Sequence, residues 1–309
     1  MNIHQKFFSK IGFNYLALGI SIVVFQIIIM NILNVINPQY LNDYNLMSII
    51  STICNYFLPF PIFYWLMKKI ESSKLEKTEI NVKTFILYIG ITLTLMWIGN
   101  LIGLAITSIL SSAMQNEITN PVQQLINSSD IWFNVTIISI IGPIIEEILF
   151  RKFLIDRTIK YGAKVSIILS AVLFALFHGN LNQFFYVLLL GGFLAYVYIR
   201  TGNIIYPIIL HCIVNVMGAV VSLLIVSSVN NIQTGLNLID AGIIIIYIIF
   251  LFSMLIIGLY GLTKFKKARF NGTKTKIPLE YPYTTMFINL GMICFIAFYI
   301  FEMVFQALG

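Results

Sequence analysis

The sequence predicts an all-α fold, a polytopic bundle of about eight or nine membrane-spanning helices with a cytoplasmic N-terminus. The first reason is composition, because 59% of the 309 residues are hydrophobic and only 10% are charged, against about 25% charged residues in a soluble domain. The second is the recurrence of apolar runs of roughly 17 to 25 residues, the length that crosses a bilayer. The third is the distribution of the basic residues along the chain.

Apolar runs of spanning length recur along the chain, at 13–34, 48–67, 84–110, 131–150, 204–226, 239–262 and 284–306. Two further runs, 165–178 and 184–199, are shorter and would form short or tilted spans. Counting both gives nine spans. Either short segment could instead be re-entrant.

The basic residues favour nine spans, because cytoplasmic loops collect Lys and Arg. All 19 of them lie in alternate loops, at 1–12, 68–83, 151–164, Arg200 and 264–276. The opposite loops contain none: 35–47, 111–130, 179–183 and 227–238. The alternation predicts a multi-pass protein of the cell membrane, in contact with membrane lipids. The net charge of +7 therefore reflects topology and does not indicate a nucleic-acid partner.

Ionisable side chains within the apolar runs are the most informative residues, because each charge costs about 2.5–3.5 kcal/mol to insert. They are Glu146, Glu147, Arg151 at a span end, His178, His211 and Glu302. Glu302 lies near the external end of the last run, where a carboxylate can reach water at the interface. The other ionisable side chains need hydrogen-bond or ion-pair partners inside the bundle.

Glu146 and Glu147 are adjacent in the fourth apolar run, Ile-Gly-Pro-Ile-Ile-Glu-Glu-Ile-Leu-Phe-Arg. Glu147 and Arg151 are four residues apart, so they share one helix face and can form an ion pair. Glu146 points about 100° away and needs another partner. This geometry predicts that Glu147 and Arg151 support the structure while Glu146 faces a cavity.

The remaining polar residues recur at the same spacing. His178 follows Phe174 by four residues, which places an imidazole beside an aromatic ring. Asn215 follows His211 by four, again on one helix face, where ordinary interhelical hydrogen bonding is the simpler interpretation. Together these residues assemble a carboxylate, two imidazoles and an amide on three consecutive polar patches.

This set of side chains is sufficient for hydrolysis of a peptide bond. A carboxylate kept away from water can act as a general base near neutral pH, and an imidazole can share or relay the proton. A second His and an Asn can donate hydrogen bonds to the oxyanion of a tetrahedral intermediate.

The motifs Glu-Glu-x-x-x-Arg, Phe-x-x-x-His and His-x-x-x-Asn occur here in order, beginning at Glu146, Phe174 and His211. In this the chain resembles the CPBP family, the CAAX proteases and bacteriocin-processing (Abi) proteins, which include the Ras-converting prenyl-protein endopeptidases. The likeness covers about residues 137–220. Lys152 is a departure, since many members have Gly there, and we expect it to adjust only the helix end.

The resemblance implies catalytic roles for Glu146 and His178 in activating water, and for His211 and Asn215 in an oxyanion site. It also implies supporting roles for Glu147, Arg151 and Phe174. A set of Glu146, His178 and His211 could alternatively bind Zn²⁺. Since His-Glu-x-x-His is absent from the sequence and similar enzymes are regarded as glutamate-dependent, we favour catalysis without a metal or other cofactor.

The predicted organisation is N-terminal transmembrane helices at 1–130, a CPBP protease core at 131–228 and C-terminal transmembrane helices at 229–309. The implied activity is that of an intramembrane endopeptidase acting on a membrane-associated peptide or protein. An alternative is a bacteriocin self-immunity or sensor-regulating binding protein of the same family. The abundance of Ile, Asn and Lys is typical of an AT-rich bacterial genome, so we expect the membrane to be a bacterial plasma membrane. The sequence gives no oligomeric state.

Overall fold

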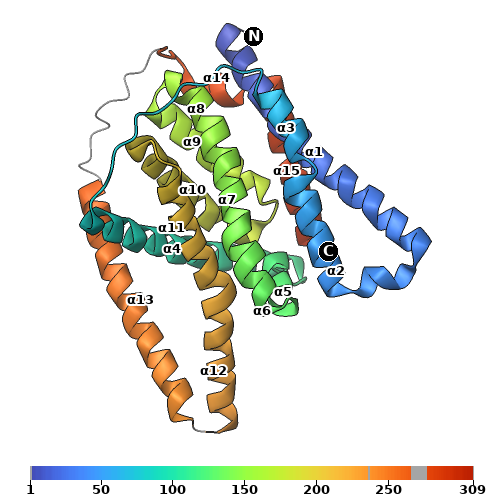
Figure 1. Cartoon of the computed structure of the whole chain (residues 1–309), viewed down its shortest axis with the longest axis vertical. Coiled ribbons are helices and arrows are strands. Elements are labelled where there is room, and N and C mark those ends of the chain that lie inside the picture. The colour runs from blue at the N-terminus through green and yellow to red at the C-terminus, as the bar shows by residue number, and fades with distance from the viewer. Residues whose placement is uncertain (1, 236, 266–276, 309) are drawn as a thin grey trace.

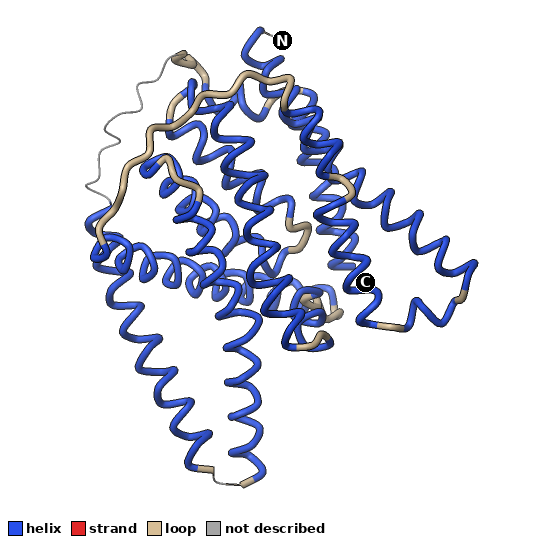
Figure 2. Tube along the Cα trace, in the orientation of Figure 1, coloured by secondary structure: helices blue, strands red, loops and turns tan. Residues whose placement is uncertain are grey.

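The computed structural model describes residues 2–235, 237–265 and 277–308, so most of the basic loop at 264–276 lies outside it. Within these ranges the chain forms helices and loops without a strand (Figures 1 and 2). Eight helices of the described chain are long and apolar enough to cross a membrane. The protein is therefore a multi-pass membrane protein with an all-helical fold, as predicted.

Several of the eight spans consist of more than one helical segment. In chain order the segments are α1 (Ile3–Ile36), η1 (Pro38–Asn42), α2 (Tyr44–Thr52), η2 (Ile53–Phe57), α3 (Phe60–Met67), α4 (Val82–Met114), α5 (Pro121–Ser128), α6 (Ile131–Phe133), η3 (Asn134–Ile141), α7 (Gly142–Glu147), η4 (Ile148–Phe153), α8 (Leu154–Thr158), η5 (Ile159–Tyr161), α9 (Ala163–Phe177), α10 (Leu181–Thr201), α11 (Ile205–Val216), η6 (Met217–Val221), α12 (Ser222–Thr234), α13 (Leu238–Phe265), α14 (Pro282–Phe287) and α15 (Leu290–Leu308).

The fourth span runs from Ile131 to Tyr161, well beyond the end expected at residue 150. Arg151 therefore lies inside this helix and is fully buried, whereas the sequence placed it at a span end. The longer helix is possible because a buried carboxylate pairs with the guanidinium. The π-helical segments η3 and η4 flank α7, and π-helical turns are frequent at functional sites.

The helix α9 is too short to count as a span. Its 15 residues rise about 22 Å, less than the roughly 30 Å of a bilayer hydrocarbon core. The count of nine spans is thus replaced by eight spans and one short helix in the described chain. Because α9 stops early, His178 at its C-terminal end lies inside the bundle.

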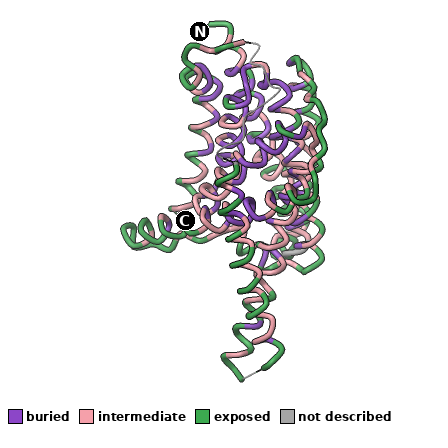
Figure 3. Tube along the Cα trace, turned by 90° about the vertical axis from the view of Figure 1, so that its left-hand side faces the viewer, coloured by how far each residue is buried: buried purple, intermediate pink, exposed green. Residues whose placement is uncertain are grey.

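The helix α10 packs against both α4 and α9. The helix α11 contacts α7 and α10. Gly99 of α4 permits a close approach to α10, because a β-carbon there would lie 2.3 Å from the Cα of Tyr186. The buried residues concentrate around these helices, and the α12–α13 hairpin projects from them with mostly exposed or half-buried residues (Figure 3). The packing leaves a polar interior between α7, α9 and α11.

Candidate active site

The two adjacent glutamates of α7 have different surroundings. Glu147 is fully buried and forms the expected ion pair with Arg151, through Oε2 to Nε at 2.9 Å. Its Oε1 accepts a hydrogen bond from Arg151 Nη2 at 3.2 Å. Such a bidentate pair fixes both side chains. Glu147 and Arg151 are therefore turned toward each other, while Glu146 is free to face another direction.

Arg151 is held by further contacts with α9. Its Nη1 donates to Ser170 Oγ at 2.7 Å, and that hydroxyl donates to the carbonyl of Phe150 at 2.9 Å. The guanidinium carbon lies 4.7 Å from the centre of the Phe174 ring, within the range of a cation–π contact. Phe174, a predicted supporting residue, thus packs against the cation.

His211 of α11 lies between the two carboxylates. Its Nδ1 is 3.0 Å from Glu147 Oε1, and its Nε2 is 3.7 Å from Glu146 Oε2. Because Glu147 accepts hydrogen bonds as a carboxylate, Nδ1 is the nitrogen that carries the hydrogen. The ring is therefore oriented with Nε2 toward Glu146.

His178 is fixed by its own helix. Its Nδ1 donates to the carbonyl oxygen of Phe174 at 2.9 Å, since a carbonyl can only accept. The ring also meets the Phe174 ring edge-on, with centroids 4.7 Å apart. In the neutral form, Nε2 of His178 is left with a lone pair that can accept a proton.

Asn215 lies one helical turn beyond His211 in α11. Its Nδ2 donates to the carbonyl of Ile138 at 2.8 Å, a group in the π-helical segment η3. The amide nitrogen carries two hydrogens, so this bond orients the side chain and leaves one hydrogen for another acceptor.

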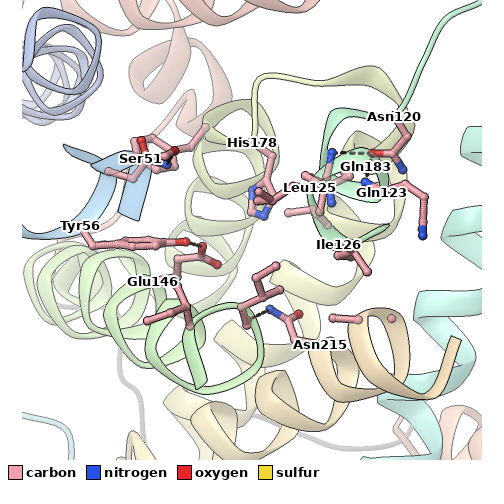
Figure 4. A pocket seen from close by; sticks show the side chains of 18 of the residues that line it. Ser51, Tyr56, Asn120, Gln123, Leu125, Ile126, Glu146, His178, Gln183 and Asn215 are labelled. Atoms are coloured by element: carbon pink, nitrogen blue, oxygen red, sulfur yellow. Dashed lines mark hydrogen bonds between the residues drawn. The ribbon is translucent and has the colours of Figure 1, made fainter. Parts of the chain in front are cut away.

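One cavity of about 480 Å³ brings the predicted catalytic residues together. Glu146, His178, His211 and Asn215 all line it, and Figure 4 shows Glu146, His178 and Asn215 around a common space. The four side chains come from α7, the end of α9, and α11. The short α9 takes part in this gathering because His178, at its end, lies in the cavity wall.

The cavity also includes residues that sequence reasoning missed. Tyr56 of η2 donates its hydroxyl hydrogen to Glu146 Oε1 at 2.8 Å (Figure 4), which supplies the partner that Glu146 needs. Gln183 of α10 lines the cavity, as does Glu302 of α15, which the sequence assigned only to the interface. A search of the spans for uncharged polar groups as well as ions would have raised Tyr56 as a candidate, but nothing in the sequence pairs it with Glu146.

The Tyr56 side chain lies close to the backbone of Gly142 where it approaches Glu146. A β-carbon at Gly142 would lie 3.1 Å from the Tyr56 hydroxyl oxygen and 3.3 Å from the Ile137 carbonyl oxygen. Gly142 stands one helical turn before Glu146, on the same side of α7. The absence of a side chain there gives the hydroxyl room to approach the carboxylate.

The alternative zinc ligands, Glu146, His178 and His211, all line this cavity. Across residues 2–235, 237–265 and 277–308, no three His, Cys, Asp or Glu side chains are arranged to hold a metal ion. Nδ1 of each histidine is bound to a protein oxygen, which leaves Nε2 as the ring nitrogen that a metal ion would use.

Comparison with known proteins identifies the segment that carries these residues. Residues 128–217 match the model of a family described as type II CAAX prenyl endopeptidase Rce1-like. A Bacillus subtilis (strain 168) protein described as "Putative membrane peptidase YdiL" is 32% identical over 93 residues, which are 29% of this chain and 37% of that relative. No solved structure matches the chain.

These matches confirm the resemblance to the CPBP intramembrane endopeptidases. The match covers residues 128–217, and this segment contains both glutamates of α7, both cavity histidines and Asn215. The aligned region spans little more than a third of the bacterial relative. Tyr56 and Glu302 lie outside the matched segment.

Proposed function

We propose that the protein is an intramembrane endopeptidase of a bacterial plasma membrane, which hydrolyses a peptide bond in a membrane-associated peptide or protein. The observation that carries the proposal is the single cavity shared by Glu146, His178, His211 and Asn215. A general base, a proton carrier and hydrogen-bond donors are the groups that peptide hydrolysis requires.

In this mechanism Glu146 and His178 bind and activate one water molecule. Glu146 Oε1 is held by Tyr56, so Oε2 faces the cavity and takes a proton as the water oxygen attacks the carbonyl carbon. His178 Nε2 accepts a hydrogen bond from the same water, because its Nδ1 is bound to Phe174. The two groups orient the water lone pair toward the substrate.

The carbonyl oxygen becomes an oxyanion, which His211 and Asn215 stabilise. Asn215 donates its second amide hydrogen, and the bond to Ile138 fixes its direction. For this role His211 carries a hydrogen on each ring nitrogen and is an imidazolium. The Nδ1 hydrogen is donated to the Glu147 carboxylate, and the Nε2 hydrogen is donated to the oxyanion. The proton taken by Glu146 then passes to the leaving amine as the carbon–nitrogen bond breaks.

The proposal is tested by incubating purified protein in detergent with a library of short peptides, with and without a strong zinc chelator. We expect cleavage by the wild type that the chelator does not affect, and no cleavage by Glu146→Gln. Loss of cleavage with chelator and recovery with Zn²⁺ would replace this mechanism by a metal-dependent one. Absence of cleavage under all conditions would favour the self-immunity or sensor-regulating role.

Tyr56→Phe is expected to lower kcat about tenfold with little change in KM. The variant keeps the ring and removes the hydrogen bond to Glu146, and hydrogen bonds to charged groups contribute about 1.5–3 kcal/mol. The matched control is Tyr64→Phe, because Tyr64 lies in the same span and is exposed. Steady-state kinetics of both variants measure the effect. Equal kcat values for Tyr56→Phe and Tyr64→Phe would show that the hydroxyl does not position the base.

A further inference from the structure

Glu302 of α15 is the second glutamate of the cavity that contains Glu146. Its Oε2 lies against the chain immediately after His178, because a β-carbon at Gly179 would be 3.2 Å from that oxygen. Gly179 has a φ of +62°, a left-handed conformation that glycine adopts readily. This turn brings the carboxylate next to the segment that carries a proposed catalytic histidine.

Among the residues that the structure describes, no Lys, Arg or His forms an ion pair with Glu302. The ion pairs formed by the described residues involve Glu146, Glu147 and Asp156, and none of them includes Glu302. The described cavity lining contains no Lys and no Arg. Ionisable groups within membrane spans are costly, usually face a bundle interior or a watery cavity, and mark binding or transport pathways.

Apart from Glu146 and the two histidines, the rest of the cavity wall is uncharged and combines apolar side chains with amides and hydroxyls. Side-chain amides of Gln26, Asn55, Asn100, Asn120, Gln123 and Gln183 line it. Amides offer both donors and acceptors, which suits the backbone of an extended peptide and does not distinguish one side chain from another. Of the two carboxylates in the described lining, Glu146 has Tyr56 and His211 as neighbours, whereas Glu302 forms no hydrogen bond or ion pair with another described residue. Glu302 is therefore the acidic group available to select a cationic side chain.

We propose that Glu302 selects substrates with a lysine or arginine side chain near the scissile bond. This inference rests on the proposed peptidase function and adds a substrate class to it. An ammonium or guanidinium group would supply the missing countercharge, and a charge-assisted hydrogen bond is stronger in a site away from bulk water. Glu146 is not available for this purpose, because Tyr56 and His211 surround its carboxylate.

The test uses neutral peptides in which one lysine is moved through successive positions, each compared with the same peptide containing norleucine. The measured quantity is the ratio of kcat/KM for the lysine peptide to that for its norleucine partner. For the wild type we expect a ratio of about tenfold to a hundredfold at one position, the range of hydrogen bonds to charged groups. In Glu302→Gln the ratio should fall to about one.

Two further variants test whether the charge preference depends on the charge at position 302. Glu302→Lys should reverse the preference in favour of a peptide with glutamate at the same position. Asp130→Asn removes a carboxylate that is exposed and does not line the cavity, so it should keep the wild-type ratio. A wild-type ratio near one at every position, or an unchanged ratio in Glu302→Gln, overturns the proposal.

Peptide-binding measurements distinguish failure of the role proposed for Glu302 from failure of the proposed peptidase function. The affinities of lysine and norleucine peptides are also measured with the Glu146→Gln variant, by fluorescence anisotropy. Preferential binding of the lysine peptide that disappears in Glu146→Gln/Glu302→Gln supports the role of Glu302 even if the wild type cleaves nothing. Cleavage without any charge preference leaves the peptidase proposal in place and removes the role of Glu302.

Discussion

Glu146→Gln is expected to lower kcat/KM for peptide hydrolysis by about 10²–10⁴-fold, the usual contribution of a general base. The amide cannot take a proton from water, but its oxygen can still accept the hydrogen bond from Tyr56. The cavity should therefore keep its shape while the chemistry is lost. Initial rates over a range of peptide concentrations measure the effect, and circular dichroism in detergent verifies the helical content.

Glu117→Gln is the matched control for this variant. The substitution removes one negative charge, as Glu146→Gln does, but Glu117 lies in an exposed loop and does not line the cavity. The kcat/KM of Glu117→Gln should therefore equal that of the wild type. If Glu146→Gln also retained wild-type turnover, Glu146 would have no part in proton transfer. The self-immunity or sensor-regulating role would then be the better explanation of the cavity.

Arg151→Met is expected to destabilise the protein by about 3–5 kcal/mol, the cost of leaving one member of a buried ion pair without its partner. Both side chains are fully buried, and the guanidinium makes two contacts with the Glu147 carboxylate. Methionine fills part of the space but leaves the carboxylate charged. Denaturant unfolding in micelles, followed by tryptophan fluorescence, measures the change.

A neighbouring pair on the same helix provides the control. Lys152 and Asp156 are also four residues apart, at 2.8 Å, but the lysine side chain is 50% exposed, and the buried Asp156 carboxylate also accepts a hydrogen bond from Tyr198. Lys152→Met should therefore cost less stability than Arg151→Met, because Asp156 keeps the Tyr198 hydrogen bond and the lost cation was half exposed. The double variant Glu147→Gln/Arg151→Met should recover much of the loss, because no buried charge remains. Equal losses in Arg151→Met and Lys152→Met would contradict this account of the buried pair.

Local spacing was the part of the site that the sequence could predict. The pairing of Glu147 with Arg151 and the contact of His178 with Phe174 follow from a separation of four residues in a helix. The expected divergence of adjacent residues also correctly directed Glu146 away from that pair. These predictions need only helix geometry, which does not depend on how the helices pack.

Contacts between distant segments could not be predicted in the same way. Tyr56 and Glu146 are 90 residues apart, and the apolar residues around Tyr56 have no periodicity that reveals which face meets α7. Likewise Glu302 looked like an interface residue, because its place on the cavity depends on how α15 packs beside the turn at Gly179. The end of α9 was uncertain until its length was known, since a short helix and a tilted span have similar sequences.

The early end of α9 bears on how the proposed peptidase site can receive water within the lipid bilayer. A helix that crossed the whole bilayer would seal this side of the bundle, whereas α9 stops after 15 residues and leaves the region beyond His178 to polar side chains. Asn120, Gln123 and Gln183 lie there, along the same cavity (Figure 4). Amides of this kind can hold water by hydrogen bonding, so we expect the water molecule that Glu146 activates to enter through this polar part of the cavity.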